Sequence, residues 1–383
     1  MSSRKLKPLG LVSACAAAVA IATAALGGHE LPVYPSYYPH EIAIETMPPE
    51  RAAGLLRDGK IQAYLGAEPR FPGELPTSLR AAESLGSFVV VRVNRASLRA
   101  QDAPSECAAI ETVARYLTGK SGFVFHPYPV TPLHGDYLYH ADRAEAVKAR
   151  FVEAPAPAPP PGLKIRAAGR LADLVRPEWR ARGPDWDAEI EEIDAAGLVA
   201  SSMTSTDGWL GPAWVRTGWF HAKRLLGDGI DDADSRHRGD ELARRLETGN
   251  YRDRVERINL ERDLVAVLTG TCRAVVVGYT VKHEYFSAEF TEGVENIASD
   301  AIAGLNSPMF IRTVKLKNFP WNGWLTLGIA GRPDAAWNPI AGFDDDFGHL
   351  LWSAVGDPAL LPSPYDTGWL LNRIADVQSS AAR

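Results

Sequence analysis

A short proline-rich segment divides this chain of 383 residues into two parts. Residues 154–162 have the sequence APAPAPPPG, in which five of nine residues are proline. Proline has no backbone N–H and a fixed φ, so this segment cannot continue a helix or a sheet and favours an extended spacer. We therefore predict a Pro-rich linker at 154–162 between a first domain at 29–153 and a second at 163–383. A long ordered surface loop is the alternative.

Strand-like and helix-like patterns alternate on both sides of this segment. Before it, we expect strands at 40–45, 61–68, 87–94 and 123–126, and helices at 48–60, 75–86, 105–120 and 141–154. After it, we expect helices at 185–197, 212–227, 240–270 and 364–378, and strands at 273–281, 309–317 and 324–330. The prediction is an α/β fold of two domains, with mixed sheets, crossover helices and a second part richer in helix. All ten tryptophans occur from Trp179 onward, so the second domain is Trp-rich.

The first 28 residues have the pattern of a secretory signal peptide. Three cations, the last of them Lys7, precede an uncharged run of 21 residues from Pro8 to Gly28 that is rich in alanine. Such a segment predicts a periplasmic or secreted protein. The run is long enough to span a bilayer, so a retained N-terminal anchor is an alternative, and through it a contact with the membrane. A lipoprotein signal ending at Cys15 is a third possibility.

The cysteine count fits an exported protein. Besides Cys15, which lies in the signal segment, the chain contains only Cys107 and Cys272. A pair of cysteines in an oxidising compartment is a candidate disulfide, and this one would connect the two halves of the chain. Two buried thiols that never meet are the alternative.

Charge and motif content exclude several function classes. Asp and Glu number 47 against 41 Lys and Arg, and loss of the signal segment would leave a net charge of about −9. An acidic chain is a poor partner for nucleic acid, because phosphate binding requires a basic face. The sequence also lacks a phosphate-binding glycine motif and the CxxCH motif of c-type haem. We expect no nucleotide and no c-type haem, while a metal stays possible without being favoured.

The densest group of chemically active side chains lies in a proline-stiffened stretch, HPYPVTPLHGDYLYHAD, at 126–142. Imidazole and carboxylate groups bind zinc, copper or non-haem iron, which makes His134, Asp136 and His140 candidate metal ligands. The same stretch could instead contact an organic ligand, through the side chains of His126, Tyr128, His134, Asp136 and His140. Ordinary loop structure is the third interpretation.

Trp209 is a further candidate ligand residue. It lies in a tryptophan-rich stretch with Trp214 and Trp219, and acidic residues such as Asp207 are close in sequence. Aromatic platforms beside carboxylates suit a sugar, although tryptophan in a large core most often serves packing.

The stretch YPSYYPHEIAIETMPPERAAGLLRDGKIQAYLGAE, with SFVVVRVNRAS at 87–97, resembles periplasmic solute-binding proteins of the phosphonate-binding-like type. The similarity covers residues 33–97 and contains no diagnostic motif. It implies two α/β lobes that close on a small ligand, with residues 126–142 contributing to the site between them. The Trp-rich part does not align with this family.

These observations favour an exported, non-catalytic protein. Its partner would be a small-molecule ligand bound between two lobes or a protein of the periplasm or membrane. The alternative is a periplasmic enzyme, metal-dependent or acting on carbohydrate. A structural or interaction protein without a small ligand is a third option.

Overall fold

A computed structural model of the chain describes residues 37–97, 103–153, 159–203, 212–319, 321, 323–333, 345–356, 359–363, 368–372 and 374–376. The predicted signal segment at 1–28 lies outside these residues. Within the described residues, no helix combines the length and the apolar character needed to cross a membrane.

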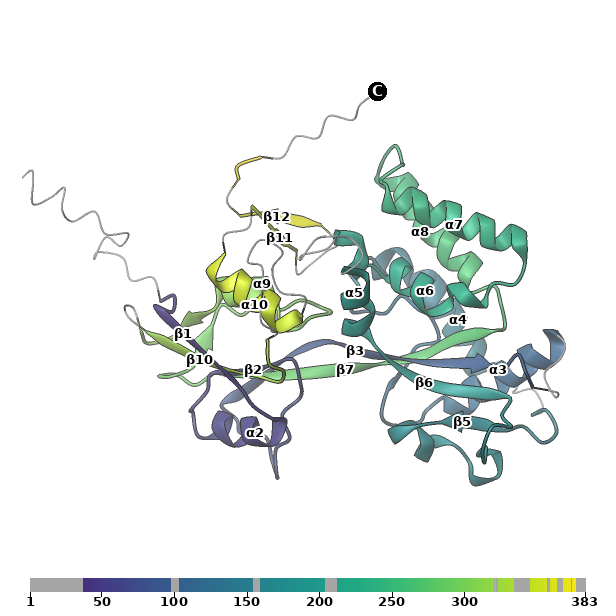
Figure 1. Ribbon diagram of the computed structural model, residues 1–383, viewed down its shortest axis with the longest axis horizontal. Helices are drawn as coiled ribbons and strands as arrows, with labels where there is room; N and C mark the ends of the chain where they lie inside the picture. The colour runs from purple at the N-terminus through teal and green to yellow at the C-terminus, as the bar shows by residue number, and fades with distance from the viewer. Residues whose placement is uncertain are drawn as a thin grey trace, which may run out of the picture.

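Strands and helices are interspersed along the chain (Figure 1). The strands are β1 (Glu41–Thr46), β2 (Ala63–Leu65), β3 (Leu79–Val93), β4 (Val124–Phe125), β5 (Ile165–Ala167), β6 (Ala188–Asp194), β7 (Ala274–Ser287), β8 (Val294–Glu295), β9 (Lys315–Leu316), β10 (Trp324–Ile329), β11 (Leu360–Pro362) and β12 (Trp369–Leu371). The helices are α2 (Pro49–Arg57), α3 (Ala103–Leu117), α4 (Ala141–Glu153), α5 (Ala195–Met203), α6 (Gly218–Leu226), α7 (Ala233–Glu247), α8 (Arg254–Leu268), α9 (Pro308–Thr313) and α10 (Asp346–Val355). The predicted α/β class is confirmed.

Eight strands form one mixed sheet in the order β1-β10-β2-β7-β3-β6-β5, with β4 paired to β7. The β1, β10 and β2 strands are parallel, whereas β3 is antiparallel to both β7 and β6. The two central strands have 15 and 14 residues, far longer than the mean strand, so each runs from one end of the molecule to the other (Figure 1).

Hydrophobic packing divides the described residues into two lobes that these long strands connect. Lobe 1, residues 37–84 and 282–376, contains one pair of apolar clusters, and lobe 2, residues 85–281, contains the other, into which Ile302 of lobe 1 also packs. The β3–β7 pairing is irregular between Leu85 and Phe88, where the strands pass from lobe to lobe. Strands from before and after the Pro-rich segment pair with one another in this sheet, as β3 does with β6. The boundary between the two lobes instead crosses the middle of β3 and β7.

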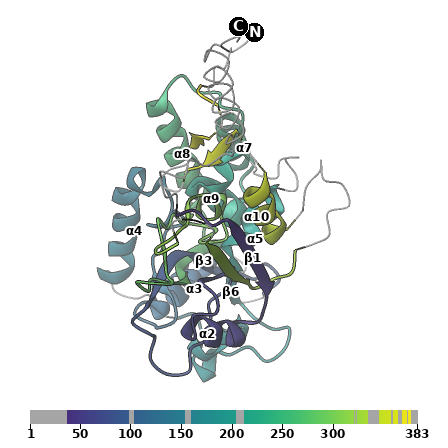
Figure 2. The ribbon, with the colours of Figure 1, turned by 90° about the vertical axis from the view of Figure 1, so that its left-hand side faces the viewer.

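Helices cover both faces of the sheet, because the strand residues alternate between two cores. In β3, Val89 and Val91 pack in the cluster that contains α3, whereas Phe88 and Val90 pack in the cluster that contains α6 and α8. In lobe 1, α2 lies on one side of the sheet and α9 and α10 on the other (Figures 1 and 2).

Four predictions of secondary structure were wrong. Residues 75–86 and 185–197, predicted as helices, form strands β3 and β6, because pairing with β7 and β3 outweighs the helix propensity of alanine and glutamate. The strand predicted at 309–317 is mainly helix α9, which Ser307 caps by accepting a hydrogen bond from the N–H of Phe310. The helix predicted at 364–378 contains strand β12 in its described part.

The disulfide predicted from the cysteine count is present. Cys107 of α3 is bonded to Cys272, which lies just before β7, with 4.8 Å between the Cα atoms. The bond closes a sequence separation of 165 residues within lobe 2. It therefore connects α3 to a strand of the central pair.

Candidate functional site

A cavity of about 290 Å³ lies between the two lobes, and we call it the interlobe cavity. Residues from lobe 1 line it, including Gly66 and Asn306, and so do residues from lobe 2, including Asp194 and Arg216. Gly86 of β3 and Lys282 of β7 complete the lining, so the connecting strands form part of its wall. A change in the angle between the lobes would change the shape of this space.

An ion pair joins the two lobes beside the cavity. Nη1 of Arg216, from lobe 2, donates to Oδ2 of Asp300, from lobe 1, at 2.6 Å. The N–H groups of Ile302 and Ala303 also donate to this aspartate. Nη2 of Arg216 is buried and has no hydrogen-bond partner among the described residues, and the same holds for Oδ1 of Asn306. A donor and an acceptor are thus left over at the cavity wall.

A second charged pair lies at the β7 side of the cavity. Lys282 Nζ is 3.8 Å from Oε1 of Glu284, which is fully buried. The N–H groups of Gly66 and Leu305 donate to the two carboxylate oxygens of Glu284. Gly304 has a φ of +69°, and a Cβ there would lie 1.7 Å from Oε2 of Glu284, so only glycine fits this close approach.

The predicted site residues of the stretch at 126–142 are buried in lobe 2, and none of them lines the interlobe cavity. His126 is buried, with Nε2 2.9 Å from the carbonyl oxygen of Val130. Nδ1 of His134 accepts from the N–H of Thr131, and its Nε2 is 2.9 Å from Nδ1 of His221 on α6. Burial lowers the pKa of His134 to about 3, so this buried histidine pair is neutral.

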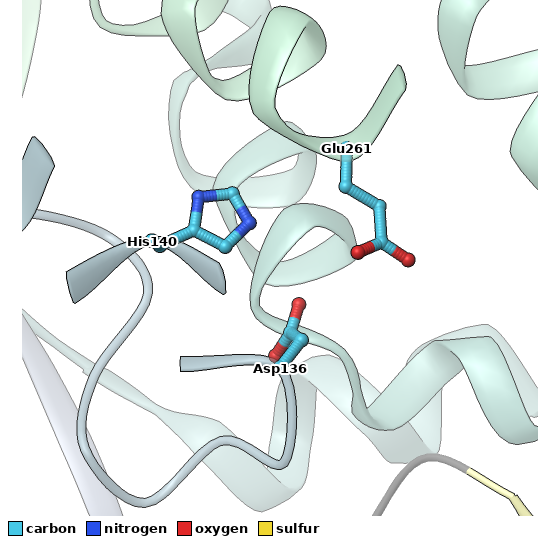
Figure 3. Close-up of side chains that lie close together, drawn as sticks. All are labelled: Asp136, His140 and Glu261. Carbon is cyan, nitrogen blue, oxygen red and sulfur yellow. The ribbon is translucent and has the colours of Figure 1, made fainter. Parts of the chain in front are cut away.

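Asp136 and His140, two of the three predicted metal ligands, come together with Glu261 of α8 (Figure 3). One ligand atom from each side chain lies within 4.8 Å of the others, and we call this group the Asp136 cluster. All three residues are buried, with at most 1% of their surface exposed. His134, the third predicted ligand, is not in this group, because His221 and Thr131 occupy its ring nitrogens.

Contacts around the cluster orient two of its members. Both carboxylate oxygens of Asp136 accept from the N–H of Gly218, at the first turn of α6. The hydroxyl of Tyr128, another predicted site residue, lies 3.0 Å from Nδ1 of His140. Nε2 of His140 and Oε2 of Glu261 are buried without a partner among the described residues.

Burial shifts the pKa of each member of the cluster toward its neutral form. Desolvation, together with the nearby charge of Asp136, raises the pKa of Glu261 to about 7. Desolvation also raises the pKa of Asp136, against the hydrogen bond from Gly218. It lowers the pKa of His140 to about 4. The arrangement therefore concentrates three titratable groups where none of their charged forms is favoured.

The sequence prediction did not include Glu261 or His221, and it included none of the residues that line the interlobe cavity. Each of the first two lies on the apolar face of its helix, since Glu261 shares a face with Leu264 and Val265, and His221 with Leu225. A charged residue on the apolar face of a predicted helix is the signal that could have indicated Glu261. Trp209 lies outside the described residues.

No protein-family model and no curated protein matches the chain. Among solved structures, it is similar to the oligopeptide-binding protein AppA of Bacillus subtilis, in complex with a nonapeptide, at 12% identity and a TM-score of 0.37. That match covers 70% of this chain and 59% of AppA. The periplasmic murein tripeptide binding protein MppA, unliganded, matches at 11% identity and a TM-score of 0.37, over 70% of this chain and 55% of MppA.

A substrate binding protein from Microbacterium hydrocarbonoxydans, complexed with 4-hydroxybenzoate hydrazide, matches at 12% identity and a TM-score of 0.35, over 65% of this chain and 55% of that protein. This chain thus spans less than two thirds of the length of each of the three. The three solved structures are, by their own descriptions, an oligopeptide-binding, a murein tripeptide binding and a substrate binding protein.

Proposed function

We propose that this protein is an exported binding protein that holds a small solute in the interlobe cavity. The observation that carries the proposal is the position of the cavity, with walls from both lobes and from the strands that connect them. Ligand sites are concave and lie preferentially between domains, where a few polar groups fix the orientation of the ligand. A volume of about 290 Å³ suits a small molecule.

The charges of the cavity favour a solute with both an anionic group and an N–H donor. Arg216 and Lys282 supply two cations, and Asp194 and Asp346 supply carboxylates. The free Nη2 of Arg216 would donate to a carboxylate of the solute, and Oδ1 of Asn306 would accept from an amine or amide. Amino acids and short peptides have both groups.

Two features support a location outside the cytoplasm. The first 28 residues have the composition of an export signal, and Cys107 is disulfide-bonded to Cys272, a bond typical of oxidising compartments. Cell fractionation with N-terminal sequencing of the exported protein tests this part. Cleavage within the alanine-rich run is expected, whereas an intact N-terminus in the membrane fraction would indicate an anchor.

Solute binding is tested by a thermal-shift screen followed by calorimetry. The panel contains amino acids, dipeptides, tripeptides, simple sugars and small anions, and we expect a rise in Tm from a zwitterionic member. Asn306→Ala removes the free acceptor at the cavity wall and is expected to weaken binding about tenfold, close to the loss of one hydrogen bond.

The matched control is Asn250→Ala, at an asparagine that follows α7 and does not line the cavity. We expect the affinity of this variant to equal that of the unchanged protein. The proposal fails if no member of the panel stabilises the protein. It also fails if the solute found binds equally well to both asparagine variants.

A further inference from the structure

The Asp136 cluster leaves two carboxylates in the core of lobe 2 with little to neutralise them. Among the described residues, Asp136 accepts hydrogen bonds only from backbone N–H groups, and Glu261 pairs with one cation, Nη1 of Arg257, at 3.4 Å from Oε1. A buried charge is costly unless it is paired or bound to a metal. With a neutral histidine, ionisation of both carboxyl groups would leave one negative charge in the core that Arg257 does not compensate.

The ligand atoms of the cluster lie close together, and two atoms of the cluster have no partner among the described residues. In Figure 3 one ring nitrogen of His140 is directed toward the space between the two carboxyl groups. This nitrogen, Nε2, and Oε2 of Glu261 are buried and have no hydrogen-bond partner among the described residues. Buried polar atoms of folded proteins are nearly always paired, so each of these two indicates a missing partner.

We propose that Asp136, His140 and Glu261 bind one divalent transition-metal cation inside lobe 2. Imidazole with two carboxylates suits zinc, manganese or ferrous iron, and zinc is the first candidate because four-coordinate sites are small and tolerate burial. In a tetrahedral zinc site, ligand atoms are about 3.4 Å apart. The ligand atoms here lie within 4.8 Å of one another, so binding would draw the three side chains together.

The surroundings supply the contacts that orient metal ligands. A histidine that binds through Nε2 carries its proton on Nδ1, and Nδ1 of His140 would donate to the hydroxyl of Tyr128, 3.0 Å away. The N–H of Gly218 holds the carboxylate of Asp136 in place. Water or a second carboxylate oxygen would be the fourth ligand.

The ion would have a structural role. None of its three ligands lines the interlobe cavity, and their burial excludes contact with a solute bound there. It would instead connect the loop that carries Asp136 and His140 to α8, more than a hundred residues further along the chain. The inference is thus independent of the proposed solute.

Proton sharing is the competing arrangement. A protonated Glu261 that donates to Asp136 or to His140 would also satisfy the free atoms. The variant Glu261→Gln separates the two, because an amide imitates a protonated carboxyl group but is a weak metal ligand. An ion site loses its metal in this variant, whereas a proton-sharing site keeps its stability.

The test uses the full exported chain, stripped with a chelator and then dialysed against zinc, manganese or cobalt chloride. Elemental analysis is expected to find about one zinc per chain. At a hundredfold excess over Kd, the metal is expected to raise Tm by about 3–6 °C. The cobalt form is expected to show the visible absorption of a four-coordinate site.

His140→Gln and Glu261→Gln are expected to lower the metal content at least tenfold while circular dichroism stays unchanged. The control is Glu256→Gln on the same helix, α8, whose carboxylate pairs with Arg245 and Arg252 at the surface. It is expected to retain the metal. The proposal is overturned if the unchanged protein binds no metal in stoichiometric amount, or if both cluster variants retain it.

Discussion

The interlobe cavity and the Asp136 cluster differ in how their charges are neutralised. In the cavity, Arg216 is paired with Asp300, and Lys282 lies near Glu284, so the main charges are balanced without a ligand. In the cluster, Glu261 has a free carboxylate oxygen and the imidazole of His140 a free nitrogen.

Both sites contain buried polar atoms without a partner among the described residues. They differ in charge, because the cations of the cavity are paired, whereas the buried carboxyl groups of the cluster need an occupant that neutralises them when they are ionised. The comparison therefore assigns an exchangeable solute to the space between the lobes and a resident ion to the core of lobe 2. Variants that affect one site and leave the other unchanged test this assignment.

The largest expected effect is on the lobe that contains the cluster. Replacing both Cys107 and Cys272 by alanine removes the disulfide of lobe 2 and should lower the free energy of unfolding by about 2–5 kcal/mol. The measurement is denaturant unfolding of the variant beside the oxidised protein. If lobe 2 is the more strongly constrained lobe, hydrogen exchange should increase there first.

Reducing agent provides the control for this prediction. It should reproduce the loss in the unchanged protein and have no effect on the double variant. Equal stability of the oxidised and reduced protein would show that the disulfide contributes nothing to lobe 2.

Arg216→Ala breaks the pair that joins the lobes beside the cavity. Since the side chains of Arg216 and Asp300 are only 15% and 7% exposed, the loss should cost about 3 kcal/mol of stability. It should also abolish solute binding while the metal content of the cluster stays the same. Chemical denaturation, calorimetry and elemental analysis measure the three quantities.

The matched control is Arg70→Ala, which breaks an exposed pair with Glu50 in which the side chains are 78% and 59% exposed. It should cost less than about 1 kcal/mol, because water and salt screen such pairs. Similar losses in the two variants would mean that the interlobe pair is no stronger than a surface pair.

Gly218→Ala tests whether the backbone of α6 positions Asp136 in the cluster. A Cβ at this position would lie 2.4 Å from Cγ1 of Val130, which is too close for any real contact. The resulting strain should cost about 1–3 kcal/mol and move the N–H that holds Asp136, so metal affinity should fall and solute affinity should not.

Gly54→Ala is its control, because no atom lies within 4 Å of the new Cβ and the residue is inside helix α2. This change should stabilise the protein by about 0.5–1 kcal/mol. If Gly218→Ala leaves the metal content unchanged, the backbone of α6 does not position Asp136.

Much of the fold could be predicted from local pattern. The Val-rich run at 89–91 and the capped helix at 105–120 are strong local signals, and both elements are present. The helix predicted at 185–197 was wrong because Ala188 and Ile190 alternate with glutamates. This period-two pattern of a strand is built from residues that favour helices. The position of the boundary between the lobes could not be predicted from local pattern, because it falls within two continuous strands and depends on how β3 pairs with β7.

The sites could be predicted only in part, for a related reason. The imidazole and carboxylate side chains in one short stretch made Asp136 and His140 candidates, and the structure brings them together. Glu261 comes from a helix more than a hundred residues away, and no local pattern connects the two segments. The cavity residues are scattered along both lobes, from Gly66 to His349, and surround a space that exists only after folding.

The smallest expected effect concerns Glu256, which represents a third class of charge, half-buried and fully paired. The N–H of Arg252 and the side chains of Arg245 and Arg252 donate to its carboxylate, and these hydrogen bonds lower its pKa to about 2. A lowered pKa means that the ionised form is favoured in the folded state. The contribution to stability is therefore complete above about pH 4.5 and is lost as the pH falls toward 2.

Thermal unfolding between pH 6 and pH 2 should show a smaller acid-induced loss for Glu256→Gln than for the unchanged protein. Because the pair needs neither solute nor ion, the difference should be the same with and without metal, and a metal-dependent difference would place Glu256 in contact with the cluster.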